Sequence, residues 1–157
     1  MRSEDSSAIV IQRIAARDTI PLRDIVLRPG LPPGGSHYRG DDASDTLHLG
    51  VYASRDNTLV AVATLCREPM PGEDSATSWR LRGMAILPEY RGNRLGKQLA
   101  HRCITYAAEQ GGTLVWCISR IATAPFYRAL GFTESGDTFS LPQYSDALYI
   151  RMQRLLL

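Results

Sequence analysis

The chain has 157 residues, a formal net charge of +2 and 44% hydrophobic residues, which is typical of one globular domain with a substantial core. Such a small net charge does not favour nucleic acid as a partner, and no apolar run reaches the roughly 18 residues of a membrane span. The polar N-terminus lacks the apolar segment of a signal peptide, so we expect a cytoplasmic protein without membrane association.

The N-terminal half alternates short apolar segments with turn signals. We expect a strand at 8–14, a short helix at 18–27, and a long loop over 28–45, where prolines and glycines break the chain. Two strands at 46–53 and 58–66 follow, and a polar three-residue turn joins them as a hairpin.

The C-terminal half begins with another apolar strand, and apolar residues then recur every four positions through a long helix. A wholly apolar strand, a second short helix and a final hairpin follow. These elements are expected at 79–87, 94–110, 113–119, 122–130, 139–141 and 147–154. The order predicts one α/β domain over residues 1–157, built around a mixed sheet.

The three cysteines, Cys66, Cys103 and Cys117, are odd in number and lie far apart in the sequence. We therefore expect buried reduced thiols, and neither a disulfide framework nor a metal site.

The most informative stretch joins the strand at 79–87 to the long helix. A helix N-terminus exposes unpaired N–H groups and a partial positive charge, glycines let a ligand approach the backbone, and three cations add full charges. This combination favours a phosphate or pyrophosphate, although a solvated basic turn is the alternative. The candidate residues are Arg91, Gly92, Asn93, Arg94, Leu95, Gly96 and Lys97.

Two common phosphate motifs do not match this stretch. Only three residues separate Gly92 from Gly96, and Gln98 follows Lys97, so the P-loop pattern is absent. The Gly-x-Gly-x-x-Gly fingerprint of dinucleotide-binding proteins is absent as well.

The pattern Arg-x-x-Arg-x-Gly resembles the coenzyme loop of GNAT-type N-acetyltransferases, usually written Q/R-x-x-G-x-G/A. Arg91 and Gly96 match that pattern, and Arg94 stands where the middle glycine usually is. A second motif, Phe-Tyr-x-x-Leu-Gly-Phe over 126–132, resembles the second GNAT signature. It departs from the signature upstream, with Arg120 in place of a common asparagine.

The resemblance implies a GNAT-like fold, with a mixed, mostly antiparallel sheet flanked by helices, and acetyl-CoA as co-substrate without a metal. It also implies that the loop holds the pyrophosphate, while the backbone of Met84 and Ile86 holds the pantetheine arm. A backbone N–H near Ala85 or Ile86 would serve as the oxyanion donor. A homodimer is common in the superfamily.

Tyr127 corresponds to the tyrosine that lies near the coenzyme sulfur in the superfamily, which implies a general acid for the leaving thiolate. Without the resemblance, an amphipathic core tyrosine is the more ordinary interpretation. The attacking amine must lose a proton, and His48 is the best candidate base by intrinsic pKa. Asp41, Asp42 and Glu68 are weaker candidates, a satisfied histidine on a sheet surface is the plain alternative for His48, and a water relay is a further possibility.

These expectations favour an acetyl-CoA-dependent N-acetyltransferase that acts on a primary amine of a small molecule or peptide by direct attack. A non-catalytic acyl-CoA-binding or sensing domain on the same fold is the competing hypothesis, because fold alone does not fix function. A nucleic-acid-binding domain has little support, because no aromatic residues interleave with the basic ones.

Overall fold

The computed structural model describes residues 9–32, 34–92, 94–142 and 144–156, and the side chains of 144–146 are outside this description. The chain groups into two compact units. The N-terminal unit comprises residues up to 66 and 83–103, and the C-terminal unit comprises 67–82 and 104–157. The prediction of one domain over 1–157 stays a prediction.

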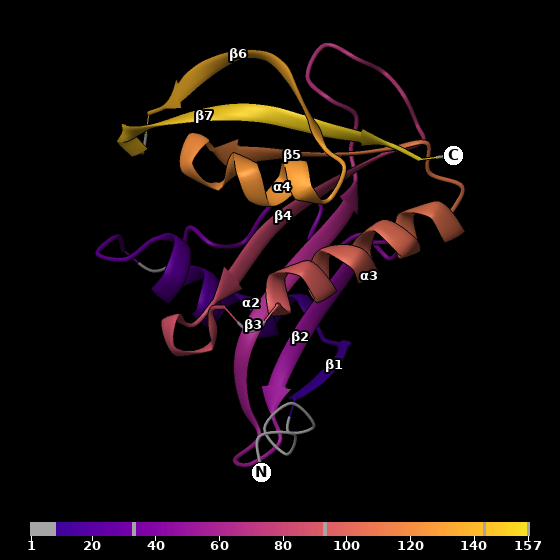
Figure 1. Ribbon diagram of the computed structural model, residues 1–157. Helices are drawn as coiled ribbons and strands as arrows, with labels where there is room; N and C mark the ends of the chain where they lie inside the picture. Colours follow the sequence, from indigo (N-terminus) through magenta and orange to yellow (C-terminus); the bar gives the residue numbers. More distant parts are fainter. Residues whose placement is uncertain (1–8, 33, 93, 143, 157) are drawn as a thin grey trace. The chain divides into compact units, whose positions relative to one another are not determined.

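The strands are hydrogen-bonded in the order β1-β2-β3-β4-β5-β7-β6 (Figure 1). Every neighbouring pair with a described register is antiparallel except β4 and β5, which are parallel. This sheet, with helices around it, confirms the predicted α/β fold class. The strands are β1 (Ile9–Arg13), β2 (Leu47–Ala53), β3 (Thr58–Arg67), β4 (Ser78–Ile86), β5 (Leu114–Arg120), β6 (Thr133–Leu141) and β7 (Tyr144–Leu155).

The helical elements follow the expected order with small shifts. They are α2 (Ala16–Leu22) with a π-turn at Arg23–Leu27, a 3-10 turn at Pro88–Tyr90, α3 (Leu95–Glu109), a 3-10 turn at Ile121–Thr123, and α4 (Ala124–Ala129). The first helix begins two residues earlier than predicted, because the Asp18 carboxylate accepts a hydrogen bond from the Ala15 N–H at 3.2 Å and caps it there. None of the described helices combines the length and apolar character needed to cross a bilayer.

Each unit has its own buried core, and β4 contributes to both. In the N-terminal unit, Leu22, Val62 and Ala85 form a buried cluster, which joins α2 to β3 and to the end of β4. In the C-terminal unit, Trp79 and Trp116 are fully buried on neighbouring strands. Burial of these large apolar surfaces is the main stabilising term for each unit.

The final hairpin is longer than predicted. β6 begins at Thr133 instead of 139, and it is mostly exposed, with an irregularity in its pairing to β7 between Ser135 and Phe139. Gly136 lies in that irregular segment with a φ of 83°. A polar strand with a bulge has no alternating apolar pattern, which is why the sequence does not reveal it.

Candidate active site

The predicted coenzyme loop leaves β4 at Ile86 and enters α3 at Leu95. The Leu87 N–H donates to the Val60 carbonyl at 2.9 Å, which fixes the strand end against β3. Arg91 is exposed, and its Nε donates to the Ile86 carbonyl at 3.2 Å, so the loop folds back onto the strand that it follows. Of the seven predicted loop residues, Asn93 lies outside the described residues.

The start of α3 has the properties that an anion site needs. The first backbone hydrogen bond of α3 runs from the Gln98 N–H to the Arg94 carbonyl at 3.0 Å. Helix geometry leaves the N–H groups before it without intrahelical partners, and no backbone partner is found for Leu95 or Gly96 among the described residues. The side chains of Arg94 and Lys97 are exposed beside them. This arrangement suits a phosphate group.

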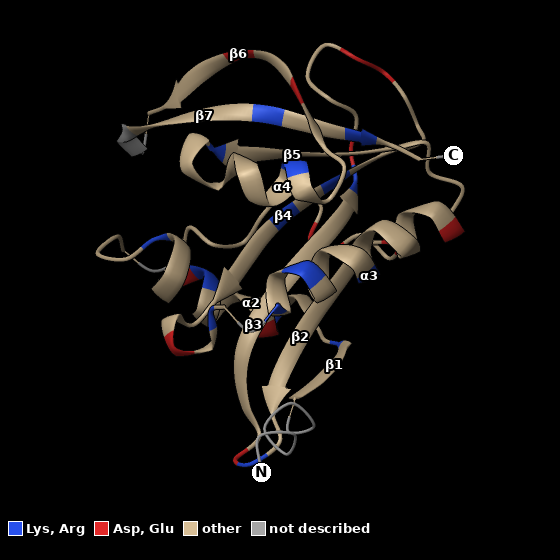
Figure 2. Ribbon diagram, viewed as in Figure 1, with Lys and Arg blue, Asp and Glu red and all other residues tan. Residues whose placement is uncertain are grey.

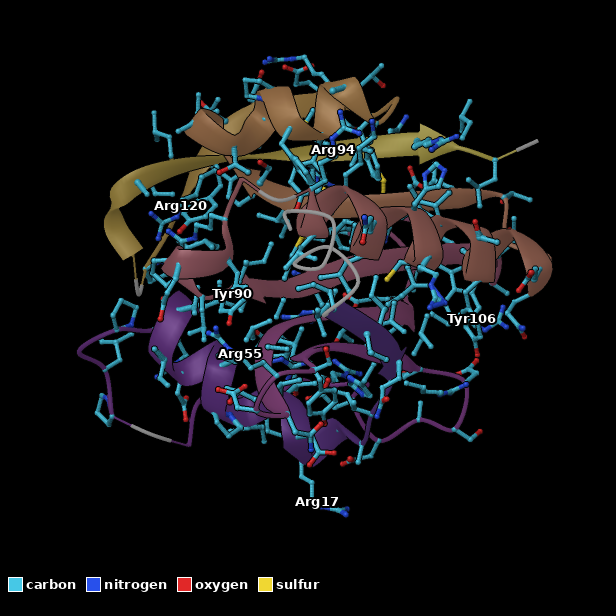
Figure 3. The ribbon with its side chains drawn as sticks, turned by 60° about the horizontal axis from the view of Figure 1, so that its bottom comes forward. Arg17, Arg55, Tyr90, Arg94, Tyr106 and Arg120 are labelled. Atoms are coloured by element: carbon cyan, nitrogen blue, oxygen red, sulfur yellow. The ribbon has the colours of Figure 1, made fainter. Side chains whose placement is uncertain are left out.

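Arg94 adopts a backbone conformation that normally belongs to glycine. Its φ is +65°, and Asn57 is the other non-glycine residue with positive φ in the described part of the chain. Figure 3 labels Arg94 where the loop enters α3. The left-handed region disfavours residues with a Cβ by about 1 kcal/mol or more. Arg94 therefore holds, at a cost in stability, a conformation that glycine adopts more easily, at the position where the GNAT pattern usually has glycine.

A buried arginine organises the N-terminal unit beside β4. The side chain of Arg23 is fully buried, and its guanidinium donates to both carboxylate oxygens of Asp41, at 2.7 and 3.1 Å. The same group donates to the Ser36 carbonyl at 2.8 Å and to the Thr64 hydroxyl at 2.7 Å. Its Cζ lies 3.9 Å from the centroid of the Tyr38 ring. This network ties the 28–45 loop to the sheet.

The electrostatics of the network favour the ionised form of Asp41. Burial alone raises the pKa of this carboxyl, but hydrogen bonds from Arg23 and from the Tyr38 N–H, together with the charge of Arg23, lower the pKa below its ordinary value. Asp41 is therefore a carboxylate that is already neutralised by a cation, and it is poorly suited to accept a proton from a substrate.

His48 belongs to the same network and is almost completely buried. Its Nε2 lies 2.9 Å from the Asp41 carbonyl oxygen, and its Nδ1 lies 2.8 Å from the Thr64 hydroxyl. Because a carbonyl only accepts, Nε2 donates a hydrogen bond to the Asp41 oxygen, while Nδ1 and the Thr64 hydroxyl form the second hydrogen bond of the ring. Both ring nitrogens are thus engaged inside the protein. This geometry argues against the base role predicted for His48 and favours a positioning role.

The other two candidate bases also have side-chain partners. Asp42 lies 3.0 Å from His37 in an exposed pair, and Glu68 pairs with Arg80 at 3.1 Å. A carboxylate held by a guanidinium is a weaker base than a solvated one. These contacts favour the alternative of a water relay for the amine proton.

The buried network packs directly against β4. Gly83 has a φ of +65°, and a Cβ placed there would meet the Tyr38 ring at 3.0 Å and the Arg23 Nε at 3.1 Å. The strand therefore needs glycine here, both for its conformation and for space. Met84 and Ile86, the predicted contacts of the pantetheine arm, are half-exposed, and Ala85 between them is buried. Arg23 belongs to no motif, so sequence reasoning had no signal by which to select it.

Tyr127 lies in the C-terminal unit on α4, and its half-buried ring is held by aromatic neighbours. The ring packs edge-to-face against Phe126 at 5.0 Å and against Phe132 at 5.5 Å between centroids. The Tyr127 carbonyl accepts the N–H groups of Leu130 and Phe132, both at 3.0 Å, which closes the helix at Gly131. The second motif thus fixes the position of the tyrosine ring within its unit, while its catalytic role remains a prediction.

Comparison with known proteins decides the family. Residues 21–132 match the model of the acetyltransferase (GNAT) family. The chain belongs to this family. The chain is 34% identical to a relative named uncharacterized N-acetyltransferase YitI, from Bacillus subtilis (strain 168), over 132 residues, and the match covers 84% of this chain and 87% of the relative. Membership confirms the predicted superfamily and the predicted enzyme class, an N-acetyltransferase.

Solved GNAT structures share the fold. Escherichia coli ElaA is similar with a TM-score of 0.75 and 18% identity, covering 93% of this chain and 99% of that chain. An aminoglycoside 6′-N-acetyltransferase complexed with coenzyme A is similar with a TM-score of 0.71 and 14% identity, covering 94% and 97%. At these identities the likeness concerns the fold alone. As a GNAT member, the chain is expected to use an acyl-CoA and an acceptor, and its loop residues fit a pyrophosphate.

Proposed function

We propose that the chain binds acetyl-CoA through residues 84–97 and transfers the acetyl group to a primary amine of a small molecule or peptide by direct attack. The observation that carries this proposal is the loop between β4 and α3, in a chain that belongs to the GNAT family. There, the backbone N–H groups of Leu95 and Gly96 have no backbone partner among the described residues, and exposed cations flank them.

The pyrophosphate is held by the loop. Backbone N–H groups of residues 94–97 point out of the helix N-terminus, and the partial positive charge of the helix adds to them. Gly92, with a φ of +84° and nothing within 4 Å of a Cβ placed there, leaves the loop surface open to a ligand. Arg91, Arg94 and Lys97 supply full positive charges from exposed positions.

The strand holds the rest of the co-substrate. Bound acetyl-CoA supplies a thioester carbonyl that an amine can attack. Met84 and Ile86 offer backbone groups from half-exposed positions on β4, and an N–H at Ala85 or Ile86 stabilises negative charge that develops on the carbonyl oxygen. Holding the carbonyl beside the amine converts the reaction into an effectively intramolecular one.

Two protons must move. Tyr127 donates a proton to the departing thiolate, and its aromatic neighbours hold the ring that carries the hydroxyl. Water removes the proton from the amine, because His48, Asp41 and Glu68 are engaged with other groups of the chain. His48 then acts as a positioning residue, since it fixes the Thr64 hydroxyl and the Asp41 backbone beside Arg23.

The test is the release of free CoA thiol from acetyl-CoA with a panel of primary amines, set against release without amine. The proposal requires amine-dependent release. Gly96→Glu places a negative charge and bulk at the loop, and we expect it to abolish acetyl-CoA binding in calorimetry. Tight binding without turnover on any amine would instead support the acyl-CoA-sensing alternative. Unaltered affinity in Gly96→Glu would exclude this loop as the coenzyme site.

A further inference from the structure

Four arginines share one face of the sheet in the C-terminal unit. The register pairs Arg80 of β4 with Trp116 of β5, and it pairs the β5 residue two positions later with Arg151 of β7. Residues two or four apart on a strand share a face, so Arg82 and Arg120 belong to the same set. Figure 2 shows the basic segments on β4, β5 and β7. This set is called the arginine face below.

On β4, the arginine face is partly neutralised. Glu68 accepts a hydrogen bond from Arg80 at 3.1 Å, and its other oxygen lies 3.9 Å from the guanidinium of Arg82. Arg80 also lies over the Trp116 ring, with its Cζ 4.8 Å from the ring. Arg80 is therefore fixed as part of the protein, and Glu68 lies close to both arginines of β4.

On β5 and β7, the charges are not balanced. Ile118 is paired with Arg151, and Arg120 is paired with Tyr149, so the two arginines are diagonal neighbours, about 7–8 Å apart at their Cα atoms. Arg120 is exposed, with its Cζ 6.0 Å from the Tyr149 ring, and Arg151 is half-exposed. Among the side chains that the structure describes, no carboxylate is paired with either guanidinium.

This arrangement has the chemistry of a carboxylate site. Long side chains at diagonal positions can bring two guanidiniums to one anion, and each guanidinium presents a planar fork that matches a carboxylate. Ile118, which is half-exposed and paired with Arg151, offers apolar surface to a carbon skeleton beside the acid group. An anion that binds there also removes the repulsion between the two cations.

We propose that the arginine face binds the carboxylate of the acceptor, so that the acceptor is an amine that also carries an acid group, such as a free amino acid. This inference rests on the proposed acetyl transfer. Arg120 ends β5 seven residues before Tyr127, the proposed general acid, and both residues lie in the C-terminal unit. Arg120 and Arg151 hold the acid group, so the protein selects amines that also carry an acid group.

The test compares acceptors that differ only in the acid group. Thiol release is measured with free amino acids and with the matching amino acid amides, at fixed acetyl-CoA. We expect kcat/KM to be at least about tenfold higher for the acids, since one charged hydrogen bond is worth that much or more. Phosphoethanolamine is included because guanidiniums also bind phosphate; its preference over every amino acid would overturn the carboxylate assignment.

Variants of Arg120 and Arg151 test whether the preference for acids depends on these two residues. Arg151→Gln and Arg120→Gln should each lower kcat/KM for the acids by about 10- to 100-fold, with the amides and the KM for acetyl-CoA unchanged. Arg151→Lys keeps the charge and should retain part of the preference. Arg17→Gln is the matched control, because Arg17 is exposed and points into solvent (Figure 3). Acid preference that survives both glutamine variants would overturn the inference.

A second measurement tests binding at the arginine face independently of acetyl transfer. Thermal unfolding is followed with saturating amino acid or amide, without acetyl-CoA. Stabilisation by acids alone, lost in Arg151→Gln, supports the arginine face even if no amine is acetylated. Equal shifts with acids and amides, or no shift, would overturn the inference while amine-dependent thiol release leaves the proposed acetyl transfer intact.

Discussion

Replacing Arg23 by methionine removes a fully buried cation and leaves its partners in place. The guanidinium donates four hydrogen bonds, two to Asp41, one to the Ser36 carbonyl and one to the Thr64 hydroxyl. Removal of one partner of a buried ion pair costs about 3–5 kcal/mol, because the other charge stays buried. For a chain of this size, each kcal/mol shifts Tm by about 2–4 °C, so we expect a fall of roughly 6–20 °C.

The stability difference between the unaltered protein and Arg23→Met should depend on pH, because Asp41 titrates differently in the two proteins. In the unaltered protein, the pKa of Asp41 is lowered in the folded state, so its contribution to stability is present above the ordinary carboxyl pKa and is lost as pH falls through the folded value. In Arg23→Met, both effects of Arg23 are lost while burial, the Tyr38 N–H and His48 remain, so the pKa of Asp41 rises relative to the unaltered protein. Asp41 then takes up a proton on mild acidification, so the stability deficit should be largest near neutral pH and should narrow toward pH 4–5.

The assay is thermal and urea unfolding of the unaltered protein and the variant between pH 4 and pH 8. Asp41→Asn in the Arg23→Met background removes the unpaired buried charge, so it should recover part of the lost stability. If the two changes acted independently, the double variant would instead lose more stability than either single variant. Arg17→Met is the control, expected within about 0.5 kcal/mol because Arg17 is exposed. A fall in Tm below about 3 °C, or a deficit that does not change with pH, would refute the reasoning.

Three further predictions concern the coenzyme site and the thiols. Tyr127→Phe should lower kcat by about 10- to 1000-fold with little change in acetyl-CoA affinity by calorimetry, and an unchanged kcat would remove the general-acid role. Arg94→Gly relieves a positive φ and removes a cation, so we expect unchanged or slightly higher Tm with about five- to tenfold weaker acetyl-CoA binding at low salt; equal affinity would show that Arg94 does not contact the phosphates. Burial raises the pKa of Cys103 and Cys117 to about 12, so iodoacetamide at pH 8 should leave both unmodified until urea unfolds the chain, as mass spectrometry will show.

Much of the fold could be predicted because its signals are local. Leu95, Leu99, Cys103 and Ala107 are all buried on α3, as their four-residue spacing predicts. The strand–loop–helix stretch at 84–97 was also predictable, because turns and helix ends depend on residue types close in sequence. The polar β6 strand was not, since its pairing depends on β7 and on a bulge, not on its own pattern.

The candidate site was only partly predictable, because long-range partners decide what a side chain can do. His48 has a suitable intrinsic pKa, but Thr64 and the Asp41 carbonyl engage its two nitrogens, and neither contact is visible in a local window. Arg23 stands in an apolar helical segment without any motif, and its importance comes from partners 13 to 41 residues away. The arginine face likewise depends on strand register, which the sequence alone does not fix.

The division of β4 between the two units has a consequence during synthesis. A nascent chain that has reached Cys103 already contains all of the N-terminal unit, together with the stretch 67–82, which belongs to the other unit. Until Leu114–Trp116 emerges, the edge of β4 at Ser78–Arg80 has no partner on that side, although it carries the large apolar side chain of Trp79. The nascent chain therefore exposes an unpaired apolar strand edge for a time on the order of seconds. Surfaces of this kind aggregate, and chaperones cover them.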